Sequence, residues 1–366
     1  MKVTSCESIV VKVPLHHHGK YGVGSLECIE NVIVVLKTDE GATGYGESSP
    51  WPVFAETAYS CKDCIDRYLG PSVIGENPLD IERLIIKMDS VLVGYPIAKT
   101  GVETALWDIA GKSMNQPVYR LLGGLVRDRI EVSYSVSRQD IAEDIGDIQW
   151  LLGLGIKRFK IKTGVLPVDK DVERLREIQK ILPPDAQLRI DYNQGLAWEQ
   201  AMISCRRCAE FQPTYMEQPV KMWDVDGMAR ITAAVDVPIS ADESVFSIHD
   251  CLRVVKAGAA DLISIKIAKH GGLSRSKKVA AIAEAAGLPC YAGAMWESGL
   301  GVAASLQVTC STPNIKYGSD YYIPCFFMVD DLIKEPLQIE DGYMLVPKGP
   351  GLGVEVDEEA VNKYRV

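Results

Sequence analysis

The sequence predicts an α/β protein: a parallel (β/α)8-type (modified TIM) barrel with an N-terminal α+β capping domain that the C-terminal tail completes. After Gly123, short apolar strands alternate with amphipathic helices roughly every 23 to 30 residues. Such units form parallel sheets, because each parallel return needs a crossover of about a dozen residues, and right-handed crossovers can close the sheet. We therefore predict a capping domain at 1–125, a barrel at 126–325 and a C-terminal segment at 326–366 that returns to the capping domain.

The N-terminal unit combines strands with helices. Residues 2–13 and 31–36 alternate apolar and polar side chains, which is typical of strands with one buried face. Residues 57–69, 79–92 and 99–114 repeat apolar side chains at the i, i+3, i+4 spacing of helices. This mixture predicts an α+β unit.

The barrel prediction competes with a doubly wound open sheet. An open sheet usually carries a glycine-rich turn after its first strand, and residues 133–140 contain no glycine. The closed arrangement is therefore favoured. The predicted strands begin near Glu131, Lys157, Gln187, Pro213, Val237, Asp261, Leu288 and Asn314.

The composition excludes several functional classes. The 366 residues are 47% apolar, which is enough for a large core, and the net charge of −10 repels phosphate backbones and anionic lipids. We therefore expect no nucleic-acid partner and no membrane partner. The apolar runs are shorter than the roughly 18 to 20 residues that span a bilayer, and the N-terminus alternates like a strand rather than a signal peptide. A cytoplasmic location follows as an expectation.

Two kinds of motif suggest metal sites but have simpler interpretations. Cys61/Cys64 and Cys205/Cys208 have the CxxC spacing, yet each pair lies in a helix-like stretch, where cysteine packs as a small apolar side chain. The run 16–18 contains three histidines, but consecutive side chains cannot all face one ion from a strand or helix. The roles of both motifs stay open.

Carboxylates end three consecutive predicted strands of the barrel. Asp191 ends the third strand, Glu217 the fourth and Asp242 the fifth. Barrel chemistry collects at the C-terminal ends of the strands, and converging carboxylates hold hard divalent cations such as Mg²⁺. Each residue alone could instead cap the helix that follows. Three in succession, flanked by lysines, favour a metal site.

Lysines flank these carboxylates on opposite sides of the predicted barrel. The second strand ends in Lys160 and Lys162, and the sixth ends in Lys266. Strands two and six lie four apart in a ring of eight, so Lys162 and Lys266 approach the cavity from opposite sides. That placement suits removal of a proton from one face of a substrate and delivery to the other. Burial near the second ammonium of Lys160 would favour a neutral, basic lysine, although a lone strand-end lysine is commonly a solvated surface residue.

The strand-end motifs together resemble the enolase superfamily. The similarity is strongest to the muconate lactonizing enzyme subgroup, within the mandelate racemase/muconate lactonizing enzyme family. It extends over essentially the whole chain, through ALWDIAGK and YRLLGG of the capping region, GAMWESGLG on the seventh strand and the closing GPGLGV. The strand-end motifs are KIK (160–162), DYN (191–193), EQP (217–219), ADES (241–244) and KIAKHGG (266–272).

The resemblance implies an enzyme that removes a proton α to a carboxylate and forms a metal-stabilised enediolate. It implies Mg²⁺, with Mn²⁺ as a substitute, bound by Asp191, Glu217 and Asp242, and an acid/base pair formed by Lys162 and Lys266. The expected reaction is isomerisation, by a racemase/epimerase or a cycloisomerase, of a small carboxylate such as an amino-acid derivative or a muconate-like acid. The resemblance also implies a homo-oligomer, as a dimer or an octamer.

Two other reactions stay open. A dehydratase would expel a β-hydroxyl from the same enediolate, for example in a hydroxyproline or an acid sugar. A Schiff-base aldolase would use Lys162 or Lys266 as a nucleophile, but it leaves the three carboxylates unexplained.

Further residues are expected to support the reaction or bind the substrate. The segment 15–27, glycine-rich with three histidines and Tyr21, is expected to be a lid that determines substrate specificity. Glu297 and Asp320 match acidic positions of the family at the seventh and eighth strands, and they either bind substrate or complete a hydrogen-bond network. The indole of Trp296 either packs in the core or faces a cationic nitrogen. The supporting residues are Lys160, Asn193, Trp296, Glu297, Asp320 and Tyr21.

Overall fold

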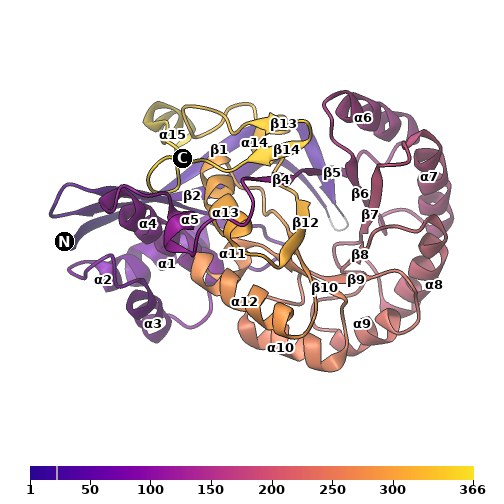
Figure 1. The fold of residues 1–366 in the computed structure, drawn as a ribbon, viewed down its shortest axis with the longest axis horizontal. Helices are drawn as coiled ribbons and strands as arrows, with labels where there is room; N and C mark the ends of the chain where they lie inside the picture. The colour runs from indigo at the N-terminus through magenta and orange to yellow at the C-terminus, as the bar shows by residue number, and fades with distance from the viewer. Residues whose placement is uncertain (22–23) are drawn as a thin grey trace.

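The computed structural model describes residues 1–16 and 24–366 in full and the backbone of 17–21. A strand-and-helix unit lies beside a ring of strands surrounded by helices (Figure 1). The ring is the predicted barrel. The first unit and the end of the chain lie together on one side of it.

The capping unit is built on a three-stranded antiparallel sheet in the order β1-β2-β3. Its strands are β1 (Val3–Tyr21), β2 (Gly24–Thr38) and β3 (Thr43–Ser48). The long helix α4 (Pro96–Ser113) packs closely on β3, because a Cβ atom at Gly46 would lie only 2.0 Å from the Gly101 carbonyl oxygen. The other helices here are α1 (Ala58–Cys64), the π-helix η1 (Ile65–Leu69), α2 (Gly70–Val73), α3 (Ile81–Val91) and α5 (Val118–Leu121).

The barrel contains eight parallel strands in the order β12-β11-β10-β9-β8-β7-β6-β5, as predicted. An isolated bridge between Val132 and Ser319 joins the two ends of this sheet, so the barrel is nearly closed. Its strands are β5 (Ser133–Val136), β6 (Arg158–Lys162), β7 (Gln187–Asp191), β8 (Met216–Glu217), β9 (Ile239–Ala241), β10 (Leu262–Ile265), β11 (Cys290–Ala292) and β12 (Ile315–Ser319). Its helices are α6 (Ile141–Gly153), α7 (Val168–Ile181), α8 (Trp198–Cys208), η2 (Ala209–Phe211), α9 (Val225–Thr232), α10 (Ile248–Ala257), α11 (Ile267–His270), α12 (Leu273–Ala285) and α13 (Gly299–Ser311).

The first barrel strand begins at Ser133, just after the predicted start near Glu131. The segment at Glu131 forms β4 (Arg129–Glu131), which belongs to a separate antiparallel sheet in the order β13-β14-β4. Its partners are β13 (Ile339–Glu340) and β14 (Tyr343–Leu345). Because residues 129–131 pair with β14, more than 200 positions later in the chain, the barrel strand begins only at Ser133.

The end of the chain returns to the capping unit. After α14 (Ile323–Phe326) and the small sheet, helix α15 (Glu358–Tyr364) packs on β1. An isolated bridge joins Val11 to Arg365, and the Val366 amide donates to the Val10 carbonyl at 3.1 Å. Both faces of the N-terminal sheet are thereby covered, by α4 on one side and by the end of the chain on the other.

Much of the segment expected to form a lid is described as strand. Its described backbone continues β1 and β2 as a hairpin, and residues 22 and 23 lie outside the described chain. Leu15 bridges to Met328, and the His16 amide donates to the Phe327 carbonyl at 2.8 Å. These pairings hold the start of the segment against the chain after α14.

The CxxC cysteines lie where the helical pattern placed them. Cys61 and Cys64 lie in α1, Cys205 and Cys208 lie in α8, and all four are buried. Burial raises the pKa of the Cys205 thiol to about 12, so this side chain packs as a neutral group.

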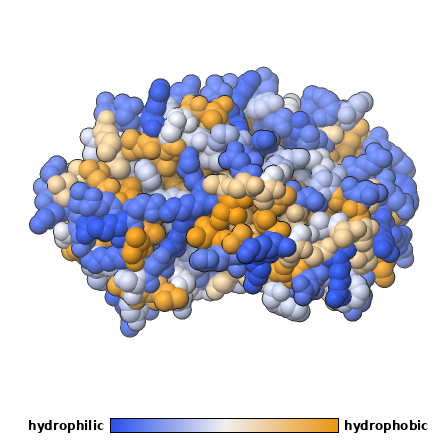
Figure 2. Space-filling view, turned by 60° about the horizontal axis from the view of Figure 1, so that its bottom comes forward, coloured by the Kyte–Doolittle hydropathy of each residue, from blue (hydrophilic) through white to orange (hydrophobic). Residues whose placement is uncertain are grey.

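In the described chain, no helix is both long and apolar enough to cross a membrane. On the face shown in Figure 2, hydrophobic residues gather near the middle, between hydrophilic margins. Among the exposed large apolar side chains is Val93, which follows α3.

Two buried glutamates of the capping unit cap helices of the barrel. Glu103 of α4 accepts from the amides of Leu273 and Ser274 at 2.8 and 2.9 Å, at the start of α12. Glu47 of β3 accepts from the Ser298 and Gly301 amides at 2.9 and 2.8 Å, at the start of α13. Helix N-termini carry unpaired amides and a partial positive charge, so these carboxylates join the two parts of the molecule.

We expect Glu103→Ala to lower the free energy of unfolding by about 3 kcal/mol, because buried donors lose their acceptor. Glu82→Ala is the matched control, since Glu82 also reaches α12, through an exposed ion pair with Lys278 at 2.8 Å. That variant should cost less than about 1 kcal/mol. Urea titration measures both, and equal losses would contradict the role given to Glu103.

Candidate active site

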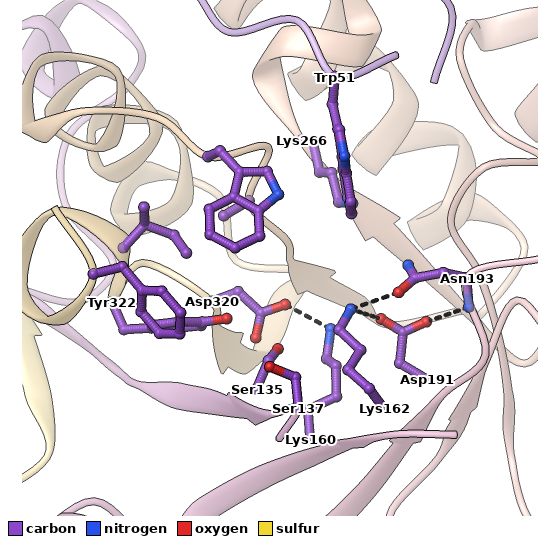
Figure 3. A pocket seen from close by; sticks show the side chains of 14 residues that line it. Trp51, Ser135, Ser137, Lys160, Lys162, Asp191, Asn193, Lys266, Asp320 and Tyr322 are labelled. Atoms are coloured by element: carbon purple, nitrogen blue, oxygen red, sulfur yellow. Dashed lines mark hydrogen bonds and ion pairs between the residues drawn. The ribbon is translucent and has the colours of Figure 1, made fainter. Parts of the chain in front are cut away.

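A pocket of about 500 Å³, partly open to solvent, lies at the C-terminal ends of the barrel strands. Figure 3 shows Lys160 and Lys162 on one side of it and Lys266 with Trp51 on the other. The lining contains most of the predicted site residues: Lys160, Lys162, Asp191, Asn193, Lys266, Trp296 and Asp320. It also contains Trp51, Ser135, Ser137, Ala294, Tyr322, Ile323 and Phe327, which the sequence did not single out.

The three predicted metal carboxylates come from adjacent strands. Asp191 and Glu217 are register partners at the ends of β7 and β8, and Asp242 directly follows β9. All three are buried. Glu217 and Asp242 do not line the pocket themselves but bond to lysines that do.

Each of these carboxylates is paired with a lysine. Within the described chain, no group of three His, Cys, Asp or Glu side chains is arranged to hold a metal ion. One Glu217 oxygen, Oε1, is buried and has no described partner. Carboxylate oxygens are the ligand type that a hard divalent cation prefers. In this structure, lysine ammonium groups bind the carboxylates that would hold such a cation.

Lys162 is held by the end of β7. Its Nζ donates to Asp191 Oδ2 at 2.6 Å and to Asn193 Oδ1 at 2.7 Å. Asn193 has a left-handed backbone (φ 42°), which asparagine adopts more readily than most residues, and its own amide donates to Asp191 Oδ1 at 2.9 Å. The DYN motif thus forms a turn that brings carboxylate and amide oxygens onto one lysine.

Lys160 lies deeper, between two carboxylates. Its Nζ donates to Glu217 Oε2 at 2.6 Å and to Asp320 Oδ2 at 2.5 Å, and it lies 4.5 Å from the centre of the Tyr291 ring. Burial opposes the charge, but Asp320 and Glu217 outweigh it and raise the pKa of Lys160 well above its ordinary value. Lys160 is therefore an ammonium, as expected, but its charge is balanced by two carboxylates that the sequence did not pair with it.

On the opposite side, Asp242 binds two lysines. Lys266 Nζ donates to Oδ2 at 2.7 Å, and Lys269 Nζ donates to Oδ1 at 2.8 Å and to the Asp242 carbonyl at 2.7 Å. Burial would raise the pKa of Asp242, but the two ammonium groups lower it instead. Sequence reasoning missed Lys269, although it stands in the same KIAKHGG motif.

Sequence reasoning also passed over a fourth buried carboxylate, Glu243. Asn193 Nδ2 donates to its Oε1 at 3.3 Å, and its Oε2 has no described partner. Burial and the neighbouring charge of Asp242 raise the pKa of Glu243 well above its ordinary value. The sequence signal for this residue was its place directly after Asp242 in the ADES motif.

Aromatic side chains form the wall between the two lysine groups. Trp51 and Trp296 meet edge to face with ring centres 6.0 Å apart, and Trp296 meets Phe327 in the same way at 5.7 Å. Trp51 comes from the loop after β3, and Phe327 follows α14. The aromatic stretches PWPVF and YYIPCFF were the only sequence signals for these contacts.

Glu297 does not line the pocket but forms part of a hydrogen-bond network, which is one of the two roles expected for it. Trp296 has a left-handed backbone (φ 74°), and the Glu297 carboxylate turns back to accept the Met295 amide at 2.6 Å. Asp320, in contrast, lines the pocket as expected. The Tyr21 side chain lies outside the described residues.

The strand-end lysines and carboxylates, on a barrel with this capping unit, define an enolase-type enzyme. Residues 5–123 match the family model "Mandelate racemase / muconate lactonizing enzyme, N-terminal domain", and residues 148–360 match the model "Enolase C-terminal domain-like". The chain belongs to the mandelate racemase/muconate lactonizing enzyme family of the enolase superfamily.

Similar proteins have three related activities. A chloromuconate cycloisomerase of Cupriavidus pinatubonensis is 34% identical over 97% of this chain and 96% of its own length. An L-Ala-D/L-Glu epimerase of Clostridium acetobutylicum is 34% identical over 94% of this chain and 96% of its own. The crystal structure of an N-succinyl Arg/Lys racemase from Bacillus cereus superposes with a TM-score of 0.96, at 31% identity, over 100% of this chain and 98% of its own. All three are isomerases that act on small carboxylates, and this chain is an enzyme of that class.

The buried Glu297 gives a pH-dependent prediction. Burial raises its pKa to about 7 from an ordinary 4.5, so between these values the folded chain holds a proton that the unfolded chain releases, and stability falls as pH rises. Glu297→Gln cannot ionise. It should therefore be more stable than wild type at pH 8, by on the order of 3 kcal/mol, with the difference disappearing below about pH 4.5.

Guanidinium titrations at pH 4.5 and pH 8 measure this difference. The exposed control Glu335→Gln should change stability by less than about 0.5 kcal/mol at both values. A Glu297→Gln protein with no gain at pH 8 would show that the site stabilises the ionised carboxylate.

Proposed function

We propose that this protein is a Mg²⁺-dependent racemase or epimerase of a small carboxylate. Lys162 and Lys266 transfer protons to and from opposite faces of the substrate's α-carbon. One observation carries the proposal. The two lysines end strands that lie four apart in the barrel order, and both line the same pocket. A substrate bound between them would present one face to each.

Asp191, Glu217 and Asp242 would hold the metal, because they offer oxygen ligands from three adjacent strands and Glu217 has a buried oxygen without a described partner. A bound divalent cation supplies Lewis-acid stabilisation of the negative charge that develops on the substrate carboxylate when the α-proton leaves.

The residues of the chain supply the proton transfers. In its neutral form, one lysine accepts the α-proton on its face, and the other lysine donates a proton to the same carbon from the opposite face. Asp320 and Glu217 keep Lys160 charged and fixed, so that its ammonium stabilises negative charge rather than acting as a base. Trp51, Trp296 and Phe327 limit the access of water.

A cycloisomerase is the second candidate, since the similarity to a chloromuconate cycloisomerase covers nearly the whole chain. The same residues would serve it, but one lysine would suffice as the acid/base. The dehydratase alternative differs by loss of a β-hydroxyl, so that water release identifies it.

We expect chelation to abolish activity, Mg²⁺ to restore it and Mn²⁺ to restore less. Mg²⁺ should also raise the melting temperature, because buried carboxylates bind it only in the folded state. Asp191→Ala, Glu217→Ala and Asp242→Ala should each lose metal affinity in calorimetry. Asp224→Ala is the matched control: this carboxylate only caps α9, so metal affinity should stay and stability should fall by about 1 kcal/mol. Full turnover after metal removal would reject the assignment.

The two-base mechanism predicts face-specific exchange in D₂O. Wild type should place deuterium at the α-carbon of both enantiomers of N-succinyl-arginine or of both epimers of Ala-Glu. Lys162→Ala should stop inversion but still exchange one enantiomer, and Lys266→Ala should exchange only the other. Mass spectrometry of the separated enantiomers measures both rates. Unchanged racemisation in either variant would rule out the two-base mechanism.

A further inference from the structure

The ammonium group of Lys266 is held by both parts of the molecule. From the barrel, Asp242 accepts from it at 2.7 Å. From the capping unit, the ring of Phe54 faces it, with Nζ 4.3 Å from the ring centre. Phe54 is 1% exposed and Lys266 is 5% exposed, so the contact is almost free of water. Desolvated cation–π contacts of this length are at the strong end of their range.

The path of the lysine side chain is also restricted. A Cβ atom at Gly293 would lie 2.6 Å from Lys266 Cε and 3.0 Å from its Cγ. Gly293 therefore provides the space through which the side chain passes before its ammonium reaches Phe54. Two aromatic neighbours fix the ring itself: Trp51 stacks on it at 5.3 Å, and Phe246 packs at 6.0 Å.

Lys162 has a different support. Its bonded partners, Asp191 and Asn193, both belong to the end of β7. Within the described chain, the capping unit gives Lys162 no hydrogen bond, ion pair or ring contact. The two lysines therefore differ in their described contacts: those of Lys162 come from the barrel, whereas the capping unit contributes to the position of Lys266.

We propose that Phe54 is a positioning residue for Lys266, through which the capping unit controls proton transfer on one face of the substrate only. This inference rests on the proposed two-base function. Phe54 does not line the pocket, so it reaches the reaction through Lys266 and not through direct contact with substrate. Removal of its ring should leave Lys266 anchored by Asp242 alone, with its ammonium less well aligned toward the α-carbon.

The test compares the two faces within one sample. The probes are N-succinyl-L-arginine and N-succinyl-D-arginine in D₂O. The enantiomer that still exchanges in Lys162→Ala identifies the face that Lys266 serves. In Phe54→Leu, exchange on that face should fall roughly tenfold relative to the other face. The ratio does not depend on the fraction of folded protein, because unfolding removes both exchange reactions equally.

Two further variants separate a ring effect from loss of packing. Phe54→Tyr keeps the aromatic face and should restore most of the ratio. Phe246→Leu removes one neighbour of Phe54 but keeps the ring that faces Lys266, so it should lower the ratio much less than Phe54→Leu does. A crystal structure of Phe54→Leu should show Lys266 Nζ still bonded to Asp242 but moved toward the space that the ring occupied.

The outcomes distinguish this inference from the proposed function. Equal losses on both faces in Phe54→Leu, an unchanged ratio, or an unmoved Lys266 would each overturn the role of Phe54 while leaving the two-base function intact. A metal-loaded wild type that exchanges neither enantiomer of any tested amino-acid derivative would instead reject the two-base function, and this inference with it.

Discussion

Burial of charge at the strand ends is the constraint on which the site depends. A buried lysine or carboxylate is costly unless an opposite charge lies beside it, and removal of one partner leaves the other uncompensated. The barrel meets this requirement across strands: Lys162 of β6 pairs with Asp191 of β7, and Lys266 after β10 pairs with Asp242 after β9. Because each pair joins two strands, the register of the parallel sheet and the geometry of the site determine one another. A slip of one strand would separate both partners from the pocket.

The same principle joins the capping unit to the barrel. Glu103 and Glu47 place carboxylates on the amides that begin α12 and α13, so buried negative charge is matched by helix N-termini instead of by cations. Both helices flank β11, the strand that leads to Trp296. The loop that carries Trp51 and Phe54 directly follows β3, the strand that contains Glu47. Trp51 and Trp296, which meet in the aromatic wall, thus both lie close in sequence to the bond between Glu47 and Ser298 that joins the two units.

Local patterns in the sequence predicted the parts of this structure that local forces decide. The barrel strands and the strand-end lysines and carboxylates follow from apolar runs that end in polar residues. The failures involve partners distant in the chain or an unusual backbone. Glu131 pairs with Tyr343 outside the barrel, and the left-handed backbone of Trp296 is followed by a Glu297 side chain that does not line the pocket. Phe54 and Lys266 are more than 200 residues apart in the chain, so the local pattern of apolar and polar residues cannot predict their contact.

The return of α15 to β1 has a consequence for how the chain acquires its structure during synthesis. The N-terminal sheet is synthesised before the barrel, but the residues that cover one of its faces, including Val356 and Val361, follow the whole barrel. Until they arrive, apolar side chains of that face, such as Val11 and Ile33, lack their final cover. Domains otherwise tend to fold in the order of synthesis. Here the capping sheet is made before the barrel, but one of its faces gains its full cover only after the barrel has been made.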